Sequence, residues 1–391
     1  MGSAFDAPRF FAAAPTREQA KRIYWNDLKR LVPAAAIRGK PSETELTIPL
    51  WHGGELFVFG MDKPERIEGA PVDGGILDEY ANIKARAWGE NVRPALSDRN
   101  AWCDLIGVPE GRNHYYDVYQ TAVAEQMSGS TEWAAFTWHS ADILPPSEIA
   151  AARRDLDALT FSQEYEASFV NFAGRAYYGF SDANKARLVP RYDPRGPLIF
   201  CLDFNVSPGV AAVVQSLRLA PDDAPVTGVI GEVWIEDNST TEIVCRKLAT
   251  DWGTHQGRVE VYGDATGGAR GTAQVSGSDW DIAKRMLRGT FGDRVSFHVK
   301  SANPKERSRV NAVNTRCCAG DGTRRLFVDP SAAPHVVKDL EGVPTVDGGS
   351  GEIDKKKHPR LTHISDALGY YVEYRFPINA GSSSVSSFAI G

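Results

Sequence analysis

The sequence contains no run of 18 or more apolar residues, which is the length that a helix needs to cross a bilayer. Its first residues, MGSAFDAPRFF, lack the basic segment followed by an apolar core that marks a secretory leader. The first absence argues against a membrane-spanning protein, and the second argues against a secreted one. We therefore expect a protein that stays in the cytoplasm of the cell that makes it.

Cysteine is scarce, and a strong excess of charge of either sign is missing. The five cysteines (103, 201, 245, 317 and 318) form no CxxC pair and no regular framework, so we expect reduced, structural thiols. The formal net charge of −6 does not indicate a nucleic-acid-binding protein. Basic residues concentrated on one face would escape this average, however, and such a face needs a separate search.

What is present is a chain of 391 residues, 42% hydrophobic and 24% charged, a composition typical of soluble globular proteins. This length exceeds one ordinary core and predicts two domains. Residues 189–197, VPRYDPRGP, mark the expected boundary. In the first half, apolar spacing predicts a helix over 16–32 with Thr16 as its N-cap, and strands over 55–61 and 74–80.

The second half has a different pattern of elements. A long helix over 147–169 is expected to lead into it. Three strands then follow one another after residue 197, and strands and helices alternate up to a last helix near 362–374. Three antiparallel strands followed by βαβα alternation predict one mixed sheet flanked by helices. This is the element order of a ribonuclease H-like fold.

Three aspartates occupy the ends of these elements: Asp203 in IFCLDFNVSPG, Asp264 in VEVYGDATGG and Asp366 in LTHISDALGYY. In a ribonuclease H-like sheet the first and fourth strands are neighbours and the last helix crosses their ends, so the three carboxylates would converge. Such a cluster repels itself unless a divalent cation lies between the charges, and hard oxygen ligands suit Mg²⁺ or Mn²⁺. Two such ions would activate a water molecule and stabilise the leaving 3′ oxygen of a phosphodiester.

Each acid also has an ordinary structural interpretation. Asp203 could cap a turn, Asp264 could accept hydrogen bonds from the glycine loop, and Asp366 could be a first-turn helix acid. Glu232, on the third strand, is a weaker fourth candidate that faces either the site or solvent. His363 precedes Asp366 by almost one helical turn and either positions water or phosphate or lies at the surface.

The first half contains part of an ATP site. In GGILDEY, Asp78 and Glu79 follow an apolar strand, as in the Walker B motif, in which the aspartate holds Mg²⁺ and the glutamate orients the attacking water. The phosphate loop GxxxxGK[ST] is not found, and the nearest text, IRGKPSE, lacks the first glycine and has Pro41 after Lys40. Either the loop lies upstream of Met1 or this domain does not hydrolyse ATP.

These motifs together resemble the large terminase subunit of tailed bacteriophages, in which an ATPase domain precedes a ribonuclease H-like nuclease. FFAAAPTREQAKRIYW resembles the segment after the phosphate loop, ILDEYA the Walker B strand, and GVPEGRNHYYDVY the coupling motif, with Pro109, Gly111 and Asn113 at its matching positions. FSQEYEASFVNFAGRAYYGF resembles the linker, and the three aspartate segments resemble the acidic nuclease motifs. The matches occur in order from about residue 10 to residue 375.

The resemblance implies an α/β chain with four parts: a partial P-loop-type ATPase domain without Walker A (1–150), a linker (151–196), a ribonuclease H-like nuclease domain (197–377) and a flexible tail (378–391). It implies a Mg²⁺- or Mn²⁺-dependent endonuclease with two ions that cuts concatemeric double-stranded DNA during viral packaging. ATP would bind only if the phosphate loop is supplied. The implied partners are DNA, a small terminase subunit and a portal protein, in the host cytoplasm and without a membrane.

A basic region independently indicates DNA contact. Residues 281–325 contain eleven Lys and Arg against four acids, a local charge of +7. A basic surface beside a metal cluster would hold a phosphate backbone without reading sequence, although a solvated helix face would have the same composition. The predicted contacts are Lys300, Lys305, Arg307 and Arg309, with Lys355, Lys356 and Lys357 closing over the strand.

Three other functions fit parts of the sequence. A non-catalytic packaging component would dock on the portal and small subunit and do no chemistry. An intact ATP-driven motor would require nucleotide binding. Another ribonuclease H-like nuclease, such as a junction resolvase, would have no need of the ILDEYA and GVPEGRN segments.

Overall fold

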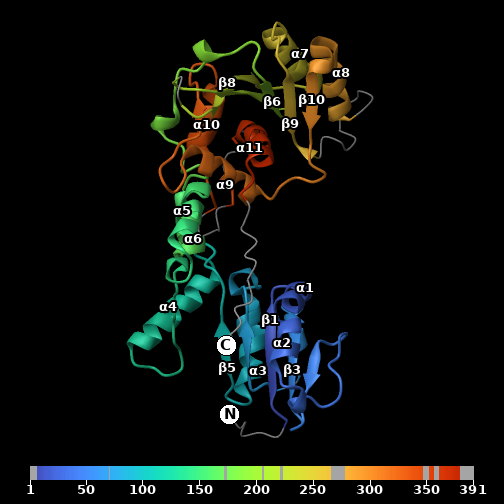
Figure 1. Ribbon diagram of the computed structural model, residues 1–391, viewed down its shortest axis with the longest axis vertical. Helices are drawn as coiled ribbons and strands as arrows, with labels where there is room; N and C mark the ends of the chain where they lie inside the picture. Colours follow the sequence, from blue (N-terminus) through green and yellow to red (C-terminus); the bar gives the residue numbers. More distant parts are fainter. Residues whose placement is uncertain are drawn as a thin grey trace. The chain divides into compact units, whose positions relative to one another are not determined.

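The computed structural model describes residues 7–69, 71–170, 174–204, 207–220, 223–265, 278–346, 352–355 and 361–378. The chain folds into two compact units (Figure 1). The first comprises Met1–Thr137 with Ala167–Val170, and the second comprises Trp138–Glu166 with Asn171–Gly391. Residues 138–150, which were expected in the first domain, thus belong to the second unit. No helix among the described residues is long and apolar enough to cross a membrane.

A five-stranded sheet forms the centre of the first unit, in the order β2-β3-β1-β4-β5. The pairs β1–β3, β1–β4 and β4–β5 are parallel, and only β2 is antiparallel to its neighbour. The expected strands at 55–61 and 74–80 are confirmed as β3 and β4. The strands are β1 (Arg9–Ala14), β2 (Thr47–Pro49), β3 (Glu55–Gly60), β4 (Gly74–Leu77) and β5 (Trp102–Leu105).

The helix predicted over 16–32 is present with an irregular middle. It consists of α1 (Arg17–Ala20), a π-helical turn (Lys21–Trp25) and α2 (Asn26–Leu31). Thr16 caps it as expected, accepting a hydrogen bond from the backbone N–H of Gln19 at 3.2 Å. Further along, α3 (Arg93–Ser97) and α4 (His114–Met127) complete the larger helices of this unit.

A six-stranded mixed sheet forms the centre of the second unit, in the order β10-β9-β6-β7-β8-β11. The predicted meander is confirmed, because β6, β7 and β8 pair antiparallel. The predicted neighbourhood of the first and fourth strands is confirmed too, because β9 pairs parallel with β6. The strands are β6 (Leu198–Asp203), β7 (Gly209–Leu217), β8 (Val226–Ile235), β9 (Val259–Gly263), β10 (Val295–His298) and β11 (Leu326–Val328).

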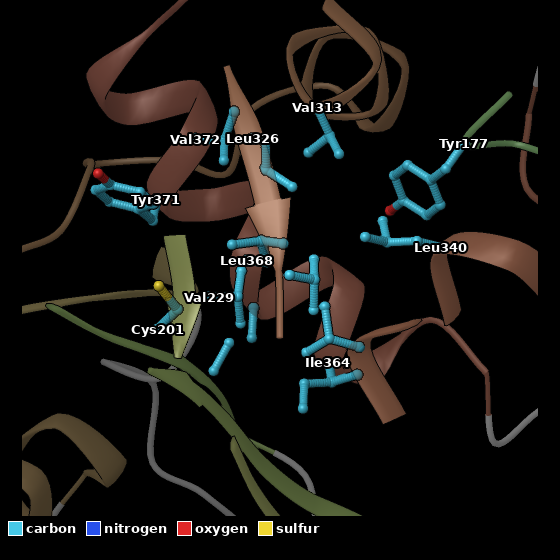
Figure 2. Close-up of a cluster of buried hydrophobic side chains, with 14 of the residues drawn as sticks. Tyr177, Cys201, Val229, Val313, Leu326, Leu340, Ile364, Leu368, Tyr371 and Val372 are labelled. Carbon is cyan, nitrogen blue, oxygen red and sulfur yellow. The ribbon is translucent and has the colours of Figure 1, made fainter. Parts of the chain in front are cut away.

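Helices cover both faces of this sheet, and apolar side chains alternate between the two layers. On one face lie α7 (Thr241–Trp252) and α8 (Asp279–Phe291), packed on Leu198, Phe200 and Leu202 of β6. On the other lie α9 (Glu306–Cys317), α10 (Pro334–Gly342) and α11 (His363–Arg375). Figure 2 shows that second cluster, in which Cys201 of β6 lies among Leu368 and Val372 of α11.

The prediction of one long helix over 147–169 is wrong. The structure has two helices there, α5 (Pro146–Asp155) and α6 (Ala158–Tyr165), with Leu156 in an extended conformation between them. Asp157 causes the break because its carboxylate accepts hydrogen bonds from the backbone N–H groups of Leu159 and Thr160, at 3.1 and 2.9 Å, and so caps a new helix. The five cysteines are all free thiols, as expected.

Candidate metal centre

Asp203 ends β6 on the side of the sheet that α11 covers. Ile199 and Cys201 face that layer, so alternation places Asp203 there as well. The side chain is 9% exposed, and its Oδ2 lies 3.2 Å from Nδ1 of His363. Burial raises the pKa of the Asp203 carboxyl, the hydrogen bond to His363 lowers it, and the negative charges of Asp366 and Asp264 raise it further. The predicted acids thus lie close enough to act on one another.

Asp264 follows β9 directly and reaches the same layer. Leu202 of β6 pairs with Gly263, so Asp264 continues the register beside Asp203. Its Oδ1 accepts a hydrogen bond from Nδ2 of Asn303 at 2.8 Å, and the backbone N–H of Ala265 donates to Oδ1 of Asn303 at 2.8 Å. Asn303 therefore fixes this carboxylate, a role that the sequence analysis missed. Its position just beyond β10, the parallel neighbour of β9, was the available signal.

Asp366 lies in the first turn of α11, and both of its carboxylate oxygens face cations. Oδ1 is 2.5 Å from Nη2 of Arg309, and Oδ2 is 3.4 Å from Nζ of Lys355. Lys355 also lies 3.0 Å from Oε2 of Glu306, at the start of α9. The third predicted acid is therefore neutralised by basic side chains from two other segments.

A buried carboxylate of α10 fixes the start of α11. Oδ2 of Asp339 accepts hydrogen bonds from the backbone N–H groups of Thr362 and Ser365, at 3.0 and 3.1 Å, and so holds the turn that carries His363 and Asp366. Burial raises the pKa of Asp339 to about 6, while its hydrogen bonds to Ser365 and Thr362 lower it and Asp366 raises it. Sequence analysis missed this residue because nothing in the α10 sequence distinguishes it from a surface helix acid.

One neighbouring side chain is affected by all three aspartates. Burial raises the pKa of the Tyr370 phenol, the cation Arg309 lowers it, and the charges of Asp203, Asp264 and Asp366 raise it. Among the described residues, however, no three His, Cys, Asp or Glu side chains already form a metal-binding group. Asn303 contacts the carboxylate of Asp264, and two basic side chains contact that of Asp366.

The donor set fits a hard divalent cation. Carboxylate oxygens are the ligands that Mg²⁺ and Mn²⁺ prefer. His363 lies beside the carboxylate of Asp203. Asp203 carries a pKa raised in part by the like charges of its neighbours. A cation between these charges would relieve that repulsion.

Glu232 is largely buried and binds the start of α10. Its side chain is 7% exposed and accepts hydrogen bonds from the backbone N–H groups of His335 and Val336 at 3.0 Å each. Its Oε1 also lies 2.6 Å from Nδ1 of His335, whose ring stacks on Trp234 with 4.1 Å between centroids. The strand register places Glu232 on the face of the sheet that Asp203 also occupies.

The expected basic surface divides into residues with different environments. Lys305 is exposed and Arg307 half-buried, whereas Lys300 forms an ion pair with Glu373. Arg309 is a correction, because it is 4% exposed and bound to Asp366, so it lies inside the unit and not on a DNA-facing surface. Lys355 is half-exposed beside Glu306, and Lys356 and Lys357 lie outside the described residues.

In the first unit, Asp78 and Glu79 follow β4, and both are half-buried. Oδ2 of Asp78 accepts from the hydroxyl of Tyr24 at 2.9 Å, and its Oδ1 accepts from the backbone N–H of Glu79 at 2.8 Å. Burial and then the charge of Asp78 raise the pKa of Tyr24, so its phenol stays a neutral donor. The Walker B-like aspartate therefore lies among neutral partners.

The predicted coupling motif is hydrogen-bonded to the segment that follows this strand. Asn113 caps α4, accepting from the backbone N–H of Tyr115 at 3.0 Å, while its Nδ2 donates to the carbonyl of Ala81 at 3.1 Å. The ring of His114 lies 3.1 Å from the carbonyl of Tyr80. Pro109 and Gly111 are both buried in this connection, and Gly111 has a φ of +63°.

The fold defines a class: an α/β chain whose first unit has the mostly parallel sheet of an incomplete P-loop-type domain and whose second unit has a ribonuclease H-like sheet. Among solved structures, the large terminase of the thermophilic bacteriophage D6E superposes with a TM-score of 0.55 at 14% identity, over 95% of this chain and 86% of that one. The same terminase in complex with ATP-gamma-S gives 0.51 at 16% identity, over 95% and 87%. These matches show that the fold is shared.

Comparison of the amino-acid sequence with those of curated proteins finds two relatives. The large terminase subunit of Thermus virus P23-45 is 27% identical and that of Thermus phage G20c 30% identical, each over 262 residues. This region is 63% of this chain and 51% of each relative, so the chain spans about half the length of the curated relatives that it matches. No family model matches. The resemblance predicted from the sequence is confirmed: the chain is similar to phage large terminase subunits.

Proposed function

We propose that this chain acts in viral DNA packaging as a large terminase subunit, and that its second unit is a Mg²⁺- or Mn²⁺-dependent endonuclease that cuts concatemeric double-stranded DNA. The observation that carries the proposal is that Asp203 and Asp264 follow two paired strands, while His363, one turn before Asp366 on α11, lies 3.2 Å from Asp203. Their separation in sequence makes this convergence a product of the fold. The relatives and the shared fold support the same assignment.

The three aspartates would hold the ions, and a bound divalent ion supplies an activated water molecule and a stabilised leaving oxygen. The other residues orient these ligands. His363 fixes the carboxylate of Asp203, and Asn303 fixes that of Asp264. Exposed Lys305 would contact the phosphates of the DNA without reading bases.

For the first unit we propose a part in ATP-driven packaging that depends on a phosphate loop supplied to Asp78 and Glu79. The hydrogen bonds from the Asn113 and His114 side chains to the segment after Glu79 support coupling between the two motifs. The proposed partners are DNA, a small terminase subunit and a portal protein, and the proposed location is the host cytoplasm.

The test is a plasmid-nicking assay with Mn²⁺ or Mg²⁺. Asp203→Asn and Asp366→Asn are each expected to abolish relaxed and linear products, because each variant removes a charged ligand, while circular dichroism shows a folded chain. Asp251→Asn is the matched control, because Asp251 pairs with Lys247 on the surface of α7. Cleavage retained by either site variant contradicts the assignment.

A non-catalytic packaging component is the second candidate. The observation that favours it is that both carboxylate oxygens of Asp366 face cations, so the described residues hold no ready-made metal site. This candidate predicts that the wild-type chain gives no relaxed or linear plasmid at any Mn²⁺ concentration.

A further inference from the structure

Two basic side chains that differ in burial contact the carboxylate of Asp366. Arg309 comes from α9 and is 5% exposed in its side chain, whereas Lys355 comes from the described stretch 352–355 and is 52% exposed. They approach different oxygens of the same carboxylate, Oδ1 and Oδ2 respectively. The difference in burial indicates that the two contacts are not equally easy to break.

Arg309 occupies a fitted position. A Cβ on Gly369 of α11 would lie 2.6 Å from Cγ and 2.8 Å from Cδ of Arg309, so the absence of a side chain there leaves room for the arginine stem. The guanidinium carbon lies 4.6 Å from the centre of the Tyr370 ring. Burial opposes the charged form of Arg309, but Asp366 and the neighbouring phenols outweigh it and raise the pKa of the guanidinium. Arg309 is a permanent charge on Oδ1.

Lys355 is placed where its ammonium group can leave Asp366. Its 3.4 Å distance to Oδ2 of Asp366 exceeds the usual 2.7–2.9 Å or so of a charge-assisted hydrogen bond, and Oε2 of Glu306 is nearer, at 3.0 Å. Glu306 also accepts the backbone N–H of Ile353 at 3.0 Å, which keeps the segment beside α9. Lys355 can therefore withdraw to Glu306 without losing its ionic partner.

From these contacts we infer that Arg309 and Lys355 form a cationic clamp that takes the place of a divalent ion at Asp366. Arg309 stays on Oδ1, and an incoming ion exchanges with Lys355 at Oδ2. The clamp keeps the carboxylate cluster stable without metal and sets a threshold of metal concentration for loading the site. This inference rests on the proposed metal centre and adds an internal competitor to it.

The test measures Mn²⁺ binding to the full chain by isothermal titration, with Lys355→Met as the variant because methionine keeps the length of the stem without its charge. Removing a partly exposed ion pair is expected to tighten Mn²⁺ binding about two- to fivefold. Lys247→Met, which breaks the surface pair with Asp251 on α7, is expected to leave binding unchanged. Unchanged or weaker binding by Lys355→Met overturns the clamp.

A second measurement separates competition from simple structural support. Arg309→Met is expected to lower the melting temperature of the metal-free chain, and saturating Mn²⁺ is expected to raise it by more than it raises that of the wild type. A merely structural arginine would lower both melting temperatures equally, and that result overturns its part in the clamp.

The outcomes distinguish the two proposals. Mn²⁺ binding and nicking by the wild type with no change in Lys355→Met leave the endonuclease standing and remove the clamp. Mn²⁺ binding by Lys355→Met but not by the wild type supports the clamp strongly. If neither chain binds Mn²⁺, the clamp is overturned, and the plasmid assay decides the endonuclease separately.

Discussion

Each unit has an acidic residue where a helix or strand begins or ends beside its central sheet, but the two acids are neutralised differently. Asp78 after β4 is balanced by neutral donors, the hydroxyl of Tyr24 and a backbone N–H. Asp366 is balanced by full positive charges. A single half-buried carboxylate is satisfied by hydrogen bonds, whereas one that faces Asp203 and Asp264 needs a cation. The difference separates an acid that neutral hydrogen-bond donors satisfy from an acid that basic side chains neutralise.

The largest expected effect on stability comes from replacing each of the two aspartates in this comparison by alanine. Asp366→Ala strands the buried guanidinium of Arg309 and is expected to cost about 3–5 kcal/mol of unfolding free energy in the second unit. Asp78→Ala leaves only a phenol and one N–H unpaired and is expected to cost about 1–3 kcal/mol in the first unit. Denaturant unfolding followed by circular dichroism measures both. Equal losses would show that Arg309 is not a buried charge that depends on Asp366.

A smaller effect on stability is expected when the space beside Gly369 is filled. Gly369→Ala places a methyl group against the stem of Arg309 and is expected to cost about 1–3 kcal/mol of unfolding free energy through overpacking. Gly289→Ala is the matched control, because it also lies in a helix but its added Cβ would meet no atom within 4 Å. That control is expected to be neutral or stabilised by up to about 1 kcal/mol. A Gly369→Ala chain as stable as the control would contradict the fitted position of Arg309.

The last expected effect is a dependence of stability on pH at Asp339. Its pKa of about 6 exceeds the ordinary 3.8, so the folded chain binds this proton more tightly than the unfolded chain. The stability that the proton contributes is complete below pH about 4 and is lost as the pH rises through about 6. Asparagine does not titrate, so the melting temperature of Asp339→Asn minus that of the wild type is expected to increase between pH 4 and pH 6.5.

Thermal melting at several pH values measures this difference, and Asp251→Asn on the surface of α7 serves as the control. The raised pKa of Asp203 is present in both chains and cancels in the subtraction. A difference that decreases with pH would mean that Asp339 is stabilised in its charged form.

The approach of Asp203 and Asp264 could be predicted because strand order places the ends of their two strands together, and that of Asp366 because the last helix crosses those ends. Their roles as metal ligands stay predictions. Arg309 could not be assigned from its sequence, since an arginine within a basic run has the same composition whether it faces DNA or a buried carboxylate. Only the packing of α9 against α11 distinguishes the two.

Local hydrogen bonds decided two other positions. The apolar pattern over 147–169 concealed the cap at Asp157, where a side chain competes successfully for the backbone of a new helix. The sequence left open whether Glu232 faces the site or solvent; it is largely buried and binds the backbone at the start of α10. In both cases one carboxylate formed backbone hydrogen bonds that spacing alone does not show.

The room above Gly369 has a consequence for how this protein can change over time. Arg309, Asp366 and Gly369 lie on two helices far apart in the chain, yet the buried arginine needs both the counter-charge of Asp366 and the space above Gly369. A larger residue at 369 would displace the arginine, and loss of the arginine would leave the aspartate without its permanent counter-charge. Among relatives we expect these three positions to be retained or replaced together, whereas the Lys355 position is free to vary by itself.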